Sequence, residues 1–126
     1  MVKAALVSTD IERGKELVGA LERAKLKIGA ALWAVLPEYE DWRLVLSARQ
    51  FDSPNTRGGY DLLHEVLDPA GFTPGRIPTI TILPMNDPFI RDLRRRYRKF
   101  KDVEGMRPGG QIGNRFIEDG YVYRIS

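Results

Sequence analysis

The densest group of chemically active side chains lies between residues 94 and 101, where six of eight residues are basic. They are Arg94, Arg95, Arg96, Arg98, Lys99 and Lys101. The nearest acids, Asp92 and Asp102, are too few to neutralise them through i, i+4 pairs. An anionic partner would relieve the repulsion between these cations. The alternative is a solvated helix end whose positive charges complement the helix dipole.

Our first hypothesis is a small binding domain that uses a basic amphipathic helix to engage an anionic partner, with a nucleic-acid backbone favoured. About three to five phosphate contacts would give weak, salt-sensitive and largely sequence-independent binding. The side chains expected to contact the nucleic acid are all cationic. They are Arg91, Arg94, Arg95, Arg98, Lys99, Lys101, Arg107 and Arg115.

A second hypothesis uses the same helix differently. The chain would be a protein-interaction or homo-oligomeric subunit without catalysis, and the helix would dock on an acidic patch of a partner or of a second copy. Such a contact would depend more on a buried apolar anchor, such as Phe89 or Phe100, than on the arginines.

A third hypothesis is a metal-dependent nuclease. Carboxylates that could hold Mg²⁺ for phosphodiester chemistry are Glu38, Glu40, Asp41 and Asp52. The first three crowd one predicted hairpin tip, whereas Asp52 follows the other end of the second strand. This separation argues against convergence on a metal, so we predict no metal site.

Two further features offer chemistry and are better explained structurally. His64, the single histidine, follows Asp61 by three residues, so the two could pair on one helix face, but no nucleophile is positioned beside them. The glycine-rich segment 105–113 could cradle a phosphate through its backbone N–H groups, yet it lacks the ending of a P-loop. We expect this segment to be a flexible connection. No catalytic residue and no cofactor is predicted, and whether the chain is an enzyme stays open.

Length and composition bound these hypotheses. The 126 residues, 43% hydrophobic and 29% charged, suit a single compact folded domain spanning 1–126. The absence of cysteine excludes disulfides, thiolate zinc sites and cysteine nucleophiles. The longest apolar run, residues 28–36, is about half of what a membrane span needs, and the N-terminus lacks a signal-peptide pattern. We therefore expect a cytoplasmic protein that does not enter a membrane.

Charge is distributed unevenly along the chain. Residues 1–75 carry nine basic and eleven acidic side chains, whereas residues 76–126 carry eleven basic and six acidic ones. The first part is therefore slightly acidic and the second distinctly basic. This polarity says more about a partner than the small total charge of +3 does.

Local patterns predict the elements that must position the basic segment. Thr9 and Glu12 match a capping box, so a helix should run from residue 10 to about 26. The continuous apolar run 28–36 predicts a central strand covered on both faces, and the alternating run 42–49 predicts its hairpin partner. A loop over 51–59 should precede a helix from residue 60 to the proline at 69.

The second half contains the basic helix itself. Residues 79–83 predict a strand, and Asp87 with Pro88 predicts the start of a helix that carries the basic run towards Lys101. The chain should end in a hairpin of residues 111–117 and 121–125 around an acidic turn at 118–120. Trp33 and Trp42 are expected in the core.

Together these elements predict an α+β (mixed α/β) fold in the order α-β-β-α-β-α-β-β. The helices after the second and third strands would act as right-handed crossovers, which would make the strands they join parallel if these are neighbours. We expect a mixed sheet of about five strands, with helices packed on one or both faces.

Overall fold

The computed structural model describes residues 6, 8–38, 41–52, 56–72 and 77–126, and it confirms the α+β fold class. These described residues form three helices and six strands. In order they are α1 (Ser8–Arg23), β1 (Ile28–Val35), β2 (Trp42–Ala48), a 3-10 turn (Arg49–Phe51), α2 (Thr56–Leu67), β3 (Ile80–Ile82), α3 (Pro88–Tyr97), β4 (Gly110–Ile112), β5 (Arg115–Ile117) and β6 (Gly120–Ile125). Within these residues, no helix is both long and apolar enough to cross a membrane.

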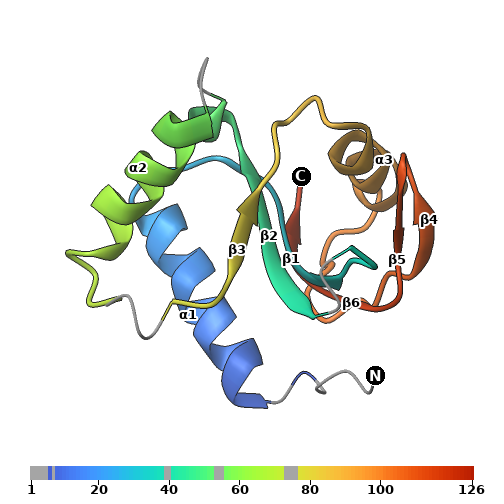
Figure 1. Ribbon diagram of the computed structural model, residues 1–126, viewed down its shortest axis with the longest axis horizontal. Coiled ribbons are helices and arrows are strands. Elements are labelled where there is room, and N and C mark those ends of the chain that lie inside the picture. Colours follow the sequence, from blue (N-terminus) through green and yellow to red (C-terminus); the bar gives the residue numbers. More distant parts are fainter. Residues whose placement is uncertain (1–5, 7, 39–40, 53–55, 73–76) are drawn as a thin grey trace.

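The strands form a main sheet and a separate ribbon (Figure 1). The main sheet has the order β3-β2-β1-β6, and β1 runs antiparallel to both of its neighbours. The chain crosses from β2 through α2 to β3, which lies parallel to β2, as the crossover argument predicts. β4 and β5 pair only with each other. The expected five-stranded sheet is thus a four-stranded sheet plus a two-stranded ribbon.

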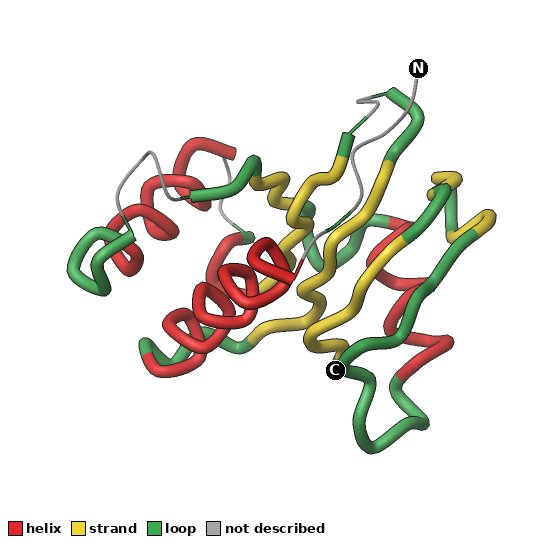
Figure 2. The backbone as a smooth tube through the Cα atoms, turned by 90° about the horizontal axis from the view of Figure 1, so that it is seen from below, coloured by secondary structure: helices red, strands yellow, loops and turns green. Residues whose placement is uncertain are grey.

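β1 is the centre of the fold because all eight of its residues are buried. Alternate side chains enter two different cores, with Ala31 and Trp33 on one face and Leu32 and Ala34 on the other. The first face packs against α1 and α2, and the second packs against α3 and the β4–β5 ribbon. Figure 2 shows helices on both sides of the strands. The prediction that this strand is covered on both faces is confirmed.

The predicted final hairpin is wrong in its pairing. Residues 111–117 contain two strands that fold back on each other across Gly113, whose φ of +56° suits a tight turn. β6 joins the main sheet beside β1 instead of pairing with residues 111–117. The acidic turn expected at residues 118–120 extends the pairing of β6 with β1, because the Val35 N–H at the end of β1 donates to the Asp119 carbonyl at 3.1 Å. An unpaired edge of β1 would have left buried backbone groups without partners.

Three predicted boundaries also move. α1 begins at Ser8, so Thr9 lies inside the helix and the capping-box prediction is wrong. α2 begins at Thr56, which is earlier than expected. Its first turns pass close to Phe51, and Gly59 permits this approach because a Cβ at position 59 would lie only 3.0 Å from the Phe51 carbonyl oxygen. α3 begins as predicted, with the Asp87 carboxylate accepting from Phe89 N–H at 2.9 Å, but it ends at Tyr97.

The glycine-rich segment 105–113 follows the main sheet before it enters β4. Gly105 N–H donates to the Val122 carbonyl at 2.8 Å, and Val122 N–H donates to the Met106 carbonyl at 2.9 Å. The segment therefore shields the outer edge of β6. Its flexibility stays a prediction.

The packing of α1 on the sheet depends on one buried tyrosine. Tyr123 of β6 donates its hydroxyl to the Ile11 carbonyl at 2.6 Å and accepts from the Trp33 indole N–H at 2.8 Å. Gly14 of α1 lies directly above it, because a Cβ on this residue would be only 2.3 Å from the Tyr123 oxygen. Burial raises the pKa of Tyr123, so the hydroxyl stays protonated and can donate.

We predict that Gly14→Ala destabilises the protein by about 1–3 kcal/mol, because the added methyl group overlaps the Tyr123 hydroxyl. The matched control is Gly19→Ala in the same helix, where the new Cβ meets only the flexible end of Arg23. This control should gain about 0.5–1 kcal/mol of helix propensity. Urea unfolding measures both free energies, and equal values for the two variants would contradict this packing.

Candidate functional site

The sequence around α3 fixes which side of the helix meets the core. Asp87 caps the first turn and Pro88 occupies the first helical position, where no backbone hydrogen bond is lost. Phe89, Ile90 and Leu93 are fully buried in the core between α3, the main sheet and the ribbon. The arginines of α3 therefore project away from this core.

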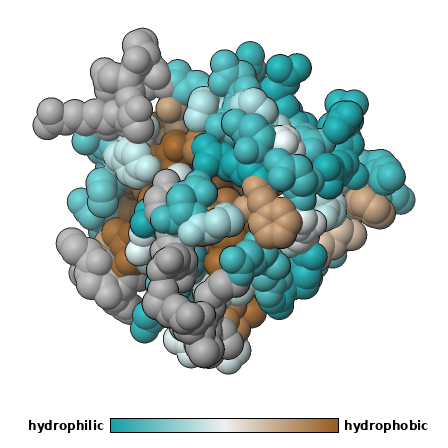
Figure 3. All heavy atoms as spheres, turned by 45° about the vertical axis from the view of Figure 1, so that its right-hand side comes forward, coloured by the Kyte–Doolittle hydropathy of each residue, from teal (hydrophilic) through white to brown (hydrophobic). Residues whose placement is uncertain are grey.

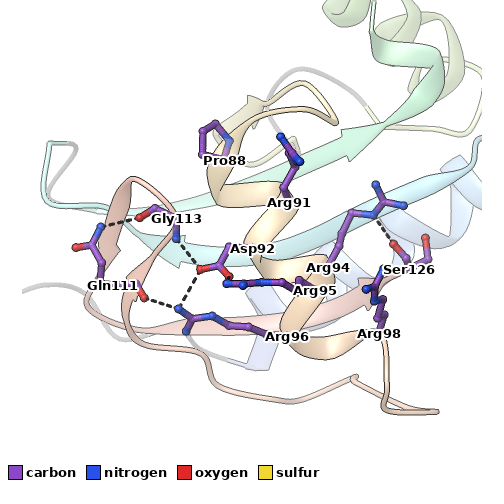
Figure 4. Close-up of a pocket in the computed structure, with 10 residues that line it drawn as sticks. All are labelled: Pro88, Arg91, Asp92, Arg94, Arg95, Arg96, Arg98, Gln111, Gly113 and Ser126. Carbon is purple, nitrogen blue, oxygen red and sulfur yellow. Dashed lines mark hydrogen bonds and ion pairs between the residues drawn. The ribbon is translucent and has the colours of Figure 1, made fainter.

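These arginines line a surface pocket of about 760 Å³, drawn in Figure 4. α3 supplies four guanidinium groups, from Arg91, Arg94, Arg95 and Arg96, and its C-cap residue Arg98 supplies a fifth. The other lining residues come from the same helix, from the β4–β5 ribbon and from the last residue of the chain. They are Pro88, Asp92, Gln111, Gly113 and Ser126. Residues from three separate segments of the chain thus line one positively charged surface pocket, here called the arginine pocket.

Asp92 is the one acidic side chain among the residues that line the pocket, and it is only 10% exposed. It accepts from Arg95, from Arg96 at 2.9 Å and from the backbone N–H of Gly113 at 2.8 Å. Hydrogen bonds, first from Arg95 and then from Gly113, lower the pKa of Asp92 to about 2. Asp92 therefore stays ionised and ties α3 to the turn of the ribbon.

The five arginines differ in how far their donors are already used. Arg96 donates to the Gln111 carbonyl at 3.0 Å as well as to Asp92, and Arg94 donates to the Ser126 carbonyl at 2.5 Å. Arg91 and Arg98 are exposed, and their side chains make no hydrogen bond or ion pair with any residue that the structure describes. Figure 4 shows Arg94 and Arg98 on the side of α3 where Ser126 lies. The guanidinium donors of Arg91 and Arg98 are thus not used within the described part of the chain.

Four of the eight predicted contact residues lie together in this pocket: Arg91, Arg94, Arg95 and Arg98. Arg96 also lines it, and the predicted contact set lacks this residue. The only signal for its role was the four-residue spacing from Asp92, which permits an ion pair on a helix. Its second partner, the Gln111 carbonyl, has no signature in the sequence.

The other four predicted contact residues do not line the pocket. Lys99 and Lys101 follow the end of α3, and the Lys99 ammonium lies 5.5 Å from the centre of the Phe100 ring. Arg107 forms a two-pronged ion pair with Asp119, at 2.6 and 3.2 Å. Their role in nucleic-acid binding stays a prediction.

Arg115, the last of these four, holds the ribbon in place. Its guanidinium lies 3.3 Å from the Glu38 carboxylate and 3.6 Å from that of Asp87, and its side chain is 25% exposed. It thus connects β5 to the cap of α3 and to the end of β1. Phe89, proposed above as an anchor for a protein partner, is fully buried and cannot serve as one, whereas Phe100 is 44% exposed.

The carboxylates proposed for a metal do not converge among the described residues. Asp41 accepts from Trp42 N–H at 2.7 Å at one end of β2, whereas Asp52 accepts from Met85 N–H at 3.2 Å beyond the other end. Glu40 lies outside the described residues. In the described ranges, no three histidine, aspartate or glutamate side chains are grouped so that they could hold a metal ion.

The remaining candidates belong to the helix surface and the core. His64 is exposed on α2, and no hydrogen bond joins it to Asp61 in the part of the chain that the structure describes. Trp33 is buried and Trp42 packs half-buried against the same core, as predicted. Tyr121 and Tyr123, with ring centres 5.4 Å apart, also pack in this core.

The buried carboxylate gives a pH-dependent prediction. Because folding lowers the pKa of Asp92 from 3.8 to about 2, its stabilising contribution is complete above pH 4 and is lost as the pH falls through 2. We expect Asp92→Asn to reduce the free energy of unfolding by about 1–2 kcal/mol at pH 7. The difference from wild type should shrink towards zero near pH 2, as measured by urea unfolding.

A matched control is Asp61→Asn, which removes an exposed carboxylate from α2. Such a surface change should alter the free energy of unfolding by less than about 0.5 kcal/mol at pH 7. A difference between wild type and Asp92→Asn that stays constant from pH 7 to pH 2 would contradict the role of the ionised carboxylate.

No protein-family model, curated protein or solved structure matches this chain. The function has therefore to be inferred from the arginine pocket and its surroundings.

Proposed function

We propose that this chain is a small cytoplasmic binding domain whose α3 pocket engages the phosphate backbone of a nucleic acid. One observation carries the proposal. Five guanidinium groups from α3 and its C-cap line one concavity, where the one acidic side chain among the lining residues is already bound by two of them. The pocket thus keeps an excess of positive charge that an anion can neutralise.

The chemistry of the guanidinium group favours phosphate as this anion. Arginine presents planar, forked donors that match the oxygens of a phosphate and can bind two of them at once. Arg91 and Arg98, exposed at the two ends of the arginine row, have such donors available. Bringing phosphates here would also relieve the repulsion among cations on neighbouring helical turns.

The length of the arginine row fits a few consecutive phosphates. From Arg91 to the C-cap Arg98 the chain advances by seven residues, which span roughly 10 Å at about 1.5 Å per residue. Phosphates along one strand of B-form DNA advance about 3.4 Å each along the helix axis and lie farther apart in space, so the row can contact only a few of them. Contacts of this kind position a backbone without reading base sequence, and the resulting affinity should fall steeply with salt.

A second candidate is a protein-interaction subunit, which the exposed ring of Phe100 favours. This side chain is 44% exposed directly after α3, with the Lys99 ammonium above its ring. An acidic partner with an apolar recess could accept Phe100 and face the arginines. Such binding would depend on the phenyl ring and only moderately on salt, because its main contribution would come from buried apolar area.

The nucleic-acid proposal predicts that Arg91→Gln/Arg98→Gln loses about tenfold or more in affinity for a labelled oligonucleotide at low salt. It should also lower the slope of log K against log salt by about 1.5–2, because two phosphate contacts disappear. Fluorescence anisotropy at several salt concentrations measures both quantities.

The matched control removes the same charge from the opposite face of the sheet. Arg13→Gln/Arg23→Gln alters two exposed arginines of α1, which packs against the other core. The control should keep the wild-type affinity within about twofold and the wild-type salt slope. Equal losses in the two double variants would show that net charge alone, and not the pocket, attracts the oligonucleotide. Failure of the wild type to bind at low salt would refute the proposal.

A further inference from the structure

Phe116, the central residue of β5, is the more exposed of the two large exposed apolar side chains in the described part of the chain, at 51%. Its neighbours on the ribbon explain why. Ile112 of β4 and Ile117 of β5 are buried in the core beneath α3. Since side chains alternate along a strand, residues 111 and 116 have to occupy the outer face.

Phe116 is also joined to the arginine pocket by the pairing of the ribbon. Phe116 lies directly opposite Gln111 in the antiparallel register, so the two side chains are on the same face of the ribbon. The Cβ atoms of such a pair are about 4.5–5.5 Å apart. Gln111 lines the pocket, and its carbonyl accepts from Arg96 at 3.0 Å. The exposed ring of Phe116 is therefore the cross-strand neighbour of Gln111, a residue that lines the arginine pocket.

The face of the molecule in Figure 3 is hydrophilic over much of its area, with apolar atoms visible between the polar side chains. An isolated exposed phenylalanine is common and needs no partner. What distinguishes Phe116 is its position beside a pocket with five guanidinium groups. A positively charged groove that follows the backbone, combined with an aromatic ring on which a base can stack, is the usual arrangement for binding single strands.

We propose that the pocket binds single-stranded nucleic acid, with its phosphates on the arginines of α3 and one base stacked on the ring of Phe116. This inference rests on the proposed function and narrows its substrate class. In a duplex the bases are stacked on each other and present only their edges, so their faces are closed to Phe116. In a single strand each base has an open face, and stacking accepts any base.

The experiment compares three labelled ligands that differ in how their bases are presented; the two single strands carry equal numbers of phosphates, and the duplex carries about twice as many. They are an oligo(dT) of about 12 nucleotides, an abasic strand of the same length and a duplex of the same length. Anisotropy is measured for wild type, Phe116→Ala, the conservative Phe116→Tyr and the control Phe100→Ala, which removes the other exposed ring. Both phenylalanines are exposed, so their loss should leave the fold intact, which urea unfolding verifies.

We expect Phe116→Ala to lose about tenfold in affinity for oligo(dT) while keeping the wild-type salt slope, because the phosphate contacts remain. Its affinity for the abasic strand should equal that of wild type, since no base is present to stack. Phe116→Tyr should restore binding, and Phe100→Ala should stay within about twofold of wild type. Oligo(U) beside oligo(dU), which differ only in the 2′-hydroxyl group, shows which sugar is preferred, and tight binding of either supports a single-strand site.

Other results would overturn the inference. If Phe116→Ala binds oligo(dT) like wild type while Arg91→Gln/Arg98→Gln loses affinity, stacking is refuted and the phosphate-binding function stands. Tighter binding of the duplex than of oligo(dT) at the same salt refutes the single-strand assignment alone. If the wild type binds none of the three ligands, both the inference and the proposed function fall.

Discussion

Every residue of β1 is buried, so each face of the main sheet has to be covered by another layer. α1 and α2 cover one face, and α3 with the β4–β5 ribbon covers the other. α3 therefore uses one side, with Phe89, Ile90 and Leu93, for the core, and its polar side has to face solvent. The burial of a single strand thus determines where the arginines point and places them beside the ribbon.

The pocket combines a rigid part with an open part. Asp92 binds Arg95, Arg96 and the turn of the ribbon, so these groups are fixed to one another by a nearly buried carboxylate. Arg91 and Arg98 stand at the two ends of the row and remain exposed. Fixed guanidinium groups lose little freedom when an anion arrives, and exposed ones can adjust to its shape. This division suits a backbone ligand whose phosphates are regularly spaced.

Local signals in the sequence were enough to predict the elements but not all of their partners. The apolar run of β1, the alternation in β2 and the cap formed by Asp87 and Pro88 are each encoded within a few residues, and the structure confirms them. The pairing of β6 with β1 joins residues about 90 positions apart, which no local pattern specifies. Counting charges likewise located the arginines of α3, but it could not show that Arg107 faces Asp119 or that Arg115 lies between Glu38 and Asp87. The role proposed for Phe116 depends on the register of the β4–β5 ribbon, whereas the sequence predicted a different hairpin for these residues.

The most direct test of the central claim is an NMR titration of the isotope-labelled protein with a short oligonucleotide at low salt. Both the backbone amide signals and the arginine Nε–H signals would be followed. If the pocket binds phosphates, the largest shifts should occur along α3 and the β4–β5 ribbon, with Arg91 and Arg98 prominent and Arg13 and Arg23 of α1 unchanged. Shifts centred on α1 and α2, or no shifts at any residue, would contradict a phosphate-binding site on α3.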